Sequence, residues 1–174
     1  KVIGRSRGVS DKLNKGIEFL FKKNKVDYLK GTASIPAAGK VEVTAADGTK
    51  TTHDTANILI ATGAKSRPMP GFPFNGTTVI GSKEAMTNTT QPKSIVVIGA
   101  GAIGIEFAYF FNAYGTKVTV VEMQPNILPV EDTEVSQTLE KSLTKAGIRI
   151  LTNTKITSTS EDGKSVKITV EGAG

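Results

Sequence analysis

Apolar and polar positions near the start of the chain predict a helix followed by a short strand. In residues 11–23, large apolar side chains recur every three or four positions, which is the spacing of one helix face. Ser10 directly precedes this run and is a suitable N-cap. The apolar and aromatic side chains of residues 26–29 then predict a strand.

The next segment predicts further strands. Residues 40–44 and 50–53 flank the pair Asp47-Gly48, which is typical of the turn of a β-hairpin. Residues 57–61 read NILIA, a short apolar run that we interpret as a buried strand. Residues 68–76 contain three prolines and two glycines, which exclude regular structure. We therefore expect residues 68–76 to connect two domains or half-domains.

The second half of the chain alternates strands with helices. Residues 94–98 are apolar and β-branched, as in a fully buried parallel strand. A helical pattern then runs up to Gly115, and a second strand covers residues 117–122. Another helix follows at residues 132–145, where Asp132 is a suitable cap, and a third strand follows at residues 148–151. This β-α-β-α-β order predicts a parallel sheet with right-handed crossovers.

The last segment returns to the spacing of β-strands. Residues 155–160 and 165–171 alternate polar and apolar side chains around the turn Glu161-Asp162-Gly163. We therefore expect a hairpin added to the parallel sheet. The fold class predicted for this half is α/β, a Rossmann-like βαβ domain with a β-hairpin addition.

A glycine-rich turn links the strand at residues 94–98 to the following helix. The turn is Gly99-Ala100-Gly101-Ala102-Ile103-Gly104. Gly99 allows the tight turn, Gly101 lets a pyrophosphate approach the backbone, and Gly104 lets the helix pack close to the strand. The helix start adds free N–H groups and a positive dipole end. A glycine turn that only packs helix on sheet is the alternative, and the surrounding strands make it the weaker one.

An acid follows at the separation that this motif requires. Glu122 lies 23 positions after Gly99 and ends the second strand, where a carboxylate can accept the hydroxyls of an adenosine ribose. A 2′-phosphate beside Glu122 would be repelled, and the next four residues are Met-Gln-Pro-Asn, without a cation. The sequence therefore predicts NAD in preference to NADP. Glu106, one turn into the helix, is a second candidate. The helix dipole stabilises a carboxylate there whether or not it binds a ligand, so a binding role and a purely structural role both stay open.

Composition narrows the function classes. There is no cysteine, and His53 is the single histidine, so we expect no metal site and no cysteine nucleophile in this chain. The net charge of +6 includes a cluster at Lys22, Lys23 and Lys25, but no nucleic-acid motif accompanies it, so a solvated helix end is favoured over a nucleic-acid site. No apolar run is long enough to cross a bilayer and the start does not resemble a signal peptide, so we expect no membrane partner and a cytoplasmic location.

Four phrases together resemble the flavoprotein disulfide reductases, and among these most of all the dihydrolipoamide dehydrogenases. The phrases are GAGAIGIE at residues 99–106, KVTVVE at 117–122, ILPVEDTEV at 127–135 and ILIATGAKSRPMPG at 58–71. The resemblance extends over nearly the whole chain. It implies that residues 1–85 form the later part of an FAD-binding domain and that residues 86–174 form an incomplete NAD-binding domain.

The resemblance also assigns cofactor-binding residues. Glu106 matches an acid that reaches toward the nicotinamide amide, with Ile103 beside it, and Ile156 matches an apolar residue near the adenine of NAD. The expected NAD site therefore consists of Gly99, Ala100, Gly101, Ala102, Ile103, Gly104, Ile105, Glu106, Glu122 and Ile156. Thr62, Gly63 and Ala64 match a segment whose backbone contacts FAD. Ala33 stands where the family usually has a glycine near the adenine of FAD.

Several parts of the family pattern are missing from these residues. They are the first glycine motif for FAD, the redox-active cysteine pair, the later FAD-binding segment and the C-terminal His-Glu pair. The expected identity is therefore an internal fragment, without catalytic residues of its own, of an enzyme that passes electrons from dihydrolipoamide through a disulfide and FAD to NAD. We expect the fragment alone to be inactive.

The resemblance further implies a homodimeric parent enzyme. Its partner would be the lipoyl carrier protein of a 2-oxo acid dehydrogenase complex, in the cytoplasm or, in a eukaryote, in the mitochondrial matrix. The alternatives are a sibling NADH-dependent disulfide reductase and, for the chain as it stands, a non-catalytic dinucleotide-binding module.

Overall fold

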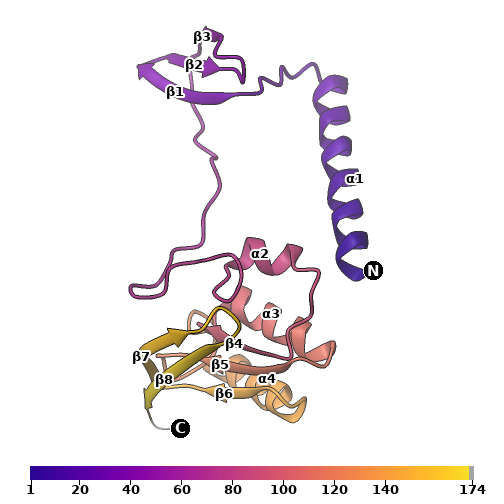
Figure 1. Cartoon of the computed structure of the whole chain (residues 1–174). Helices are drawn as coiled ribbons and strands as arrows, with labels where there is room; N and C mark the ends of the chain where they lie inside the picture. Colours follow the sequence, from indigo (N-terminus) through magenta and orange to yellow (C-terminus); the bar gives the residue numbers. More distant parts are fainter. Residues whose placement is uncertain (173–174) are drawn as a thin grey trace. The chain divides into compact units, whose positions relative to one another are not determined.

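A computed structural model describes residues 1–172 of the chain and divides it into two compact units (Figure 1). The first unit is Lys1–Lys65 and the second begins at Ser66. The domain boundary that the sequence predicts, after residue 85, stays a prediction. Within the second unit, Ile80 and Ala85 pack into the hydrophobic core.

The first unit contains one long helix and a small antiparallel sheet. Helix α1 spans Val2–Lys23. The sheet has the strands β1 Thr32–Ala37, β2 Lys40–Thr44 and β3 Lys50–Asp54, in that spatial order. The predicted hairpin is confirmed, because β2 and β3 pair in antiparallel register around a turn in which Gly48 has a φ of 86°.

Three predictions for the first unit are wrong. Helix α1 begins at Val2 and continues through Ser10, because each residue added to an existing helix gains a backbone hydrogen bond. Residues 26–29 and 57–61 form no strand, because no strand in the described part of the chain pairs with them. Strand β1 was not foreseen.

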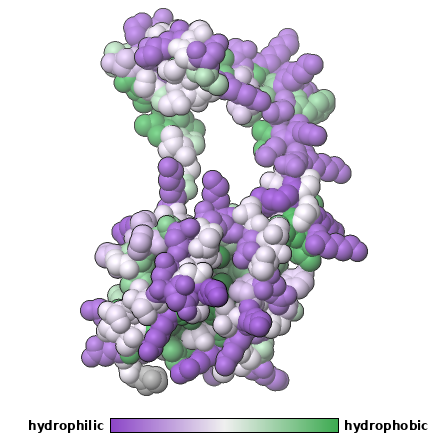
Figure 2. Space-filling view, viewed as in Figure 1, coloured by the Kyte–Doolittle hydropathy of each residue, from purple (hydrophilic) through white to green (hydrophobic). Residues whose placement is uncertain are grey.

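The apolar run at residues 57–61 is exposed instead of buried. The side chain of Leu59 is 91% exposed and that of Ile60 70%. Helix α1 likewise has no buried residue, although its apolar side chains recur at helical spacing. Figure 2 accordingly shows apolar residues at the surface of this unit. The first unit, taken by itself, therefore leaves apolar surface uncovered.

The second unit contains the parallel sheet that the sequence predicts. Strands β4 Ser94–Ile98, β5 Lys117–Val121 and β6 Arg149–Leu151 pair in parallel in that order. Helix α3 Ala102–Ala113 connects β4 to β5, and helix α4 Thr133–Lys145 connects β5 to β6. The β-α-β-α-β order is confirmed (Figure 1).

Three smaller elements complete the second unit. Helix α2 Ser82–Thr87 precedes β4. Strands β7 Thr154–Glu161 and β8 Val166–Gly172 form the predicted hairpin, which is a separate two-stranded sheet. As predicted, residues 68–76 have no helix or strand, and a single β-bridge joins Met69 to Phe72.

The core of the second unit lies on one face of the parallel sheet. Val118 and Val120 are two positions apart in β5, so their side chains point to the same face, where they pack with core residues of α3 and α4. The helix residues are Ile105, Ala108 and Phe111 from α3 and Leu143 from α4.

The prediction that residues 94–98 are buried on both faces is wrong. Val96 is 39% exposed and Ile98 41%, whereas Ile95 and Val97 pack against the core. The reason is that β4 is an end strand of this sheet, and the helices cover only the face that carries Ile95 and Val97.

Candidate functional site

The glycine turn joins β4 to α3 in a tight, left-handed bend. Gly99 has a φ of 93°, a conformation that favours glycine, and its N–H donates to the carbonyl oxygen of Val121 at 2.9 Å. Gly101 is the N-cap of α3, and no side chain among residues 1–172 caps that helix end. The first N–H groups of the helix therefore have no side-chain partner, and they carry the positive end of the helix dipole.

Gly104 and Gly101 of the turn stand in different surroundings. A Cβ on Gly104 would overlap with the carbonyl oxygen of Gly99 and lie 3.3 Å from Cγ1 of Val97. A Cβ on Gly101 would meet no atom within 4 Å. Gly104 is thus required for helix-to-strand packing, whereas Gly101 leaves open space in front of the turn. Such space is what a pyrophosphate needs to approach the backbone.

The remaining residues of the turn and helix start face in two directions. Ala100 and Ile105 are buried in the core, with exposures of 0% and 6%. Ile103 is 62% exposed, and Ala102 and Glu106 are also exposed. The exposed residues are the ones available to a ligand, while Ala100 and Ile105 hold the turn against the sheet.

Glu122 is bound to the backbone on both sides. Its Oε2 accepts the N–H of Ala100 at 2.7 Å, and its Oε1 accepts the N–H of Gln124 at 2.8 Å. A carboxylate has about four lone-pair positions, so about two remain for ribose hydroxyls. The structure therefore brings the predicted acid to the glycine turn, as the sequence required.

The loop after β5 forms a second support for the turn. The N–H of Leu128 donates to the carbonyl oxygen of Ala100 at 2.8 Å, and Leu128 has a φ of 46°, which is uncommon for a leucine. Ser136 Oγ in turn donates to the carbonyl oxygen of Leu128 at 3.3 Å. Ile127 is fully buried beside it. Sequence reasoning missed this support, since nothing in the spacing of Leu128 marks it.

Strand β7 begins beside the same acid. The N–H of Thr154 donates to the carbonyl oxygen of Glu122 at 2.9 Å, and the N–H of Asn153 donates to that of Gln124 at 3.0 Å. Ile156 follows in β7, half-buried and opposite Val170. The hairpin therefore starts at the edge of the sheet that carries Glu122.

The residues expected near FAD lie in the first unit. Ala33 is exposed in β1, opposite Val43 of β2. Thr62, Gly63 and Ala64 are exposed and irregular, and Gly63 has a φ of 78°. In the described part of the chain, no backbone hydrogen bond joins residues 62–64 to β1. Their role near FAD stays a prediction.

Other candidate sites are absent or shallow. The described residues contain no cluster of histidine and carboxylate side chains that could hold a metal. None of the helices described is both long and apolar enough to cross a membrane. His53 is exposed in β3, where its Nε2 lies 3.3 Å from Thr51 Oγ1.

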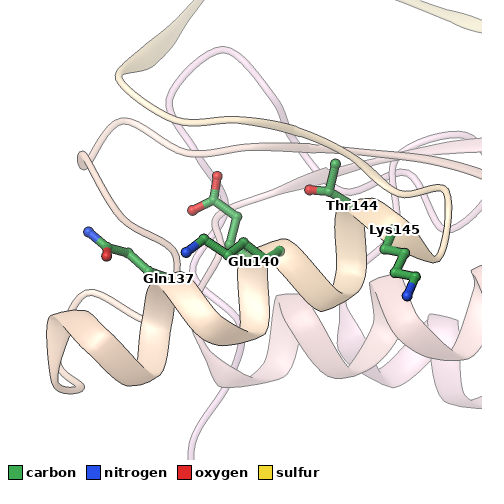
Figure 3. A pocket seen from close by; sticks show the side chains of 5 residues that line it. Gln137, Glu140, Thr144 and Lys145 are labelled. Atoms are coloured by element: carbon green, nitrogen blue, oxygen red, sulfur yellow. The ribbon is translucent and has the colours of Figure 1, made fainter.

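An open hollow lies along one side of α4 (Figure 3). All the side chains that line it come from this single helix, so it is a feature of the helix surface. They are Gln137, Glu140, Lys141, Thr144 and Lys145.

Comparison with known proteins connects this geometry to a family. A family model described as pyridine nucleotide-disulphide oxidoreductase matches residues 2–174. The dihydrolipoyl dehydrogenase of Chlorobaculum parvum is 41% identical over 174 residues, which cover 99% of this chain and 37% of that protein. The dihydrolipoamide dehydrogenase of Chaetomium thermophilum is 46% identical over 162 residues, 92% of this chain and 32% of that protein.

A solved structure agrees with the sequence matches. LpdA from Mycobacterium tuberculosis has a TM-score of 0.88 and 26% identity, covering 99% of this chain and 39% of that one. The chain thus spans less than two fifths of the length of each relative named here. Its α/β fold, its glycine turn and its sequence all lead to one assignment. The chain belongs to the pyridine nucleotide-disulphide oxidoreductase family.

Proposed function

We propose that the second unit binds NAD at the glycine turn, with Glu122 holding the adenosine ribose. The observation that carries this proposal is the contact between Glu122 and Ala100, which places a half-buried carboxylate directly at the uncapped start of α3. A diphosphate and a ribose diol match these two groups, because the N–H donors face an anion and the carboxylate accepts hydroxyls. Dihydrolipoyl dehydrogenases use NAD and FAD as cofactors.

The residues of this chain fit the NAD half of that cofactor pair. Gly101 leaves the space that a pyrophosphate would fill, and the N–H groups of Ala102 and Ile103 stand at the helix start. Glu106 and Ile103 are exposed on the first turns of α3, and we assign them to the nicotinamide end. Ile156 completes the proposed site at the adenine end. When bound, FAD supplies the two-electron carrier between a dithiol and the nicotinamide.

The enzyme to which this chain contributes is, in our proposal, a dihydrolipoyl dehydrogenase. Electrons would pass from dihydrolipoamide through a disulfide and FAD to NAD. The support is the set of relatives with that name at about 40% identity. Residues 1–85 would contribute to the FAD-binding domain through Ala33, Thr62, Gly63 and Ala64, and residues 86–174 would form most of the NAD-binding domain.

The partners and the activity of the separate chain are part of the same proposal. The parent enzyme would be a homodimer that acts on a lipoyl carrier protein in the cytoplasm or the mitochondrial matrix. The 174 residues contain no cysteine and hence no dithiol, so we expect them alone to show no lipoamide turnover with added FAD and NAD. Measurable turnover would contradict this expectation.

A sibling disulfide reductase is the second candidate. The observation that favours it is the TM-score of 0.81 to the flavoprotein disulfide reductase RclA from Escherichia coli, at 27% identity. Both candidates share the NAD site, so the binding experiment below tests what they have in common. Steady-state turnover of the full-length protein with dihydrolipoamide separates them.

The test of the NAD site is binding of NAD and NADP to the chain and to Glu122→Ala, by calorimetry. We expect NAD affinity to fall by about 10- to 100-fold, because hydrogen bonds to a charged group contribute about 1.5–3 kcal/mol. The preference for NAD over NADP should fall as well, since the repulsion of a 2′-phosphate is removed. Glu131→Ala, an exposed acid in the following loop, is the matched control. Unchanged affinity for both cofactors in Glu122→Ala would refute the ribose assignment.

A further inference from the structure

We infer that Glu122 is also a positioning residue, which holds the glycine turn in its binding conformation before any cofactor arrives. The inference rests on the proposed function, because the turn is taken to be the pyrophosphate cradle. It adds a role to Glu122 that does not involve the ribose.

The peptide groups of Ala100 are fixed from both sides. The N–H donates to Glu122 Oε2 at 2.7 Å, and the carbonyl oxygen accepts the N–H of Leu128 at 2.8 Å. Ala100 itself is fully buried. Ala100 lies between Gly99 and Gly101, so fixing its two peptide groups fixes the direction in which the backbone enters α3.

The same carboxylate fixes the loop that provides the second contact. Oε1 accepts the N–H of Gln124 at 2.8 Å, at the start of the segment that leads to Leu128. Leu128 is held in its left-handed conformation, and Ser136 Oγ donates to its carbonyl oxygen. A strained backbone persists only where its surroundings determine it. Glu122 therefore connects the turn and the loop through one charged side chain.

A carboxylate is suited to this role for a chemical reason. Both oxygens face N–H donors, and an ionised carboxylate accepts at both, with stronger bonds than a neutral group makes. A glutamine in its place could accept at one oxygen only, and its NH₂ group would face the other N–H. An aspartate keeps the charge but is one methylene shorter, so it cannot bridge both donors in the same backbone.

The test is amide hydrogen exchange of the ligand-free chain, measured by NMR at Ala100 and Gln124. We compare the wild-type chain with Glu122→Gln and Glu122→Asp, and Glu131→Gln serves as the control. In both Glu122 variants we expect exchange to accelerate about tenfold or more at one or both amides, the effect of losing a charge-assisted bond. The amide of Val120, in the centre of β5, should exchange at the wild-type rate in every variant.

Two results would overturn the inference. The first is wild-type exchange at Ala100 and Gln124 in both Glu122 variants, which is what a residue that only contacts ribose would give. The second is equal acceleration at Val120, which would indicate loss of global stability rather than of a local contact.

Because no cofactor is present, this result is independent of NAD binding. Failure of the proposed function would appear in the calorimetric experiment, and failure of the positioning role would appear here. If both roles are correct, Glu122→Ala should have a reduced preference for NAD over NADP. Its affinity for NADP should nevertheless stay below the affinity of the wild type for NAD, because its turn is no longer held.

Discussion

Gly104 in α3 packs directly against the carbonyl oxygen of Gly99, with no room for a Cβ between them. Cγ1 of Val97 lies on another side, 3.3 Å from the position of that Cβ. We therefore expect Gly104→Ala to force α3 away from β4 and to reduce the free energy of unfolding by about 1–3 kcal/mol, the usual cost of overpacking. Urea denaturation of the chain and of the variant measures this difference. Equal stability would show that the helix shifts at no cost.

Gly101→Ala should have the opposite profile. Gly101 has a φ of −69° and a ψ of 175°, which alanine adopts readily, and a Cβ there meets no atom within 4 Å. The free energy of unfolding should therefore stay within about 0.5 kcal/mol of the wild type. NAD binding should weaken by about tenfold or more, because the methyl group fills the space of the pyrophosphate. Calorimetry with NAD and urea denaturation of the same sample test both halves, and wild-type affinity would remove Gly101 from the site.

Asn75 connects the segment before α2 to the β7–β8 hairpin. Its Nδ2 donates to Glu161 Oε2 at 2.8 Å, and its Oδ1 accepts the N–H groups of residues 77–79. Asn75→Asp replaces this donor by a second carboxylate beside Glu161, so we expect a loss of about 1 kcal/mol in the free energy of unfolding. The double variant with Glu161→Gln should recover most of it, because the glutamine NH₂ again supplies a donor. A double variant as unstable as Asn75→Asp would contradict this explanation.

Asp162 makes the β7–β8 turn sensitive to acid. The N–H groups of Lys164 and Ser165 donate to its Oδ1 at 2.8 Å and 2.7 Å, and these bonds lower the pKa of the carboxyl below its ordinary value of 3.8. A lowered folded-state pKa means that the stabilisation is complete above the unfolded-state pKa and is lost as the pH falls through the folded-state value. NMR titration of the Asp162 carboxyl carbon should therefore show a midpoint below 3.8.

Asp162→Asn is the matched variant for this titration. It lacks the titrating group, so the pH dependence of its unfolding below about pH 4 should be weaker than that of the wild type. In the wild type, a titration midpoint of the Asp162 carboxyl at or above its ordinary value would contradict the role of the two N–H donors.

Local patterns in the sequence determined much of the second unit. The alternation of strand and helix patterns in residues 94–151 predicted the parallel sheet, and the glycine spacing predicted the turn. Asp132 was correctly predicted as the cap of α4, where its side chain accepts the N–H of Glu134. These features depend on neighbours a few positions apart, so the sequence itself contains the information. The position of Glu122 beside the turn follows in the same way, because parallel strands end at a common edge.

Only the tertiary structure decided which of these local patterns are buried and which polar groups meet. The apolar run at residues 57–61 looks like a strand, yet it forms none, because strand formation needs a paired neighbour that the described residues do not offer. The exposure of Val96 on β4 likewise depends on what covers the sheet. The spacing predicted that Glu122 lies near the glycine turn. It did not predict that Glu122 accepts the N–H of Ala100, or that Leu128 donates to the carbonyl oxygen of Ala100.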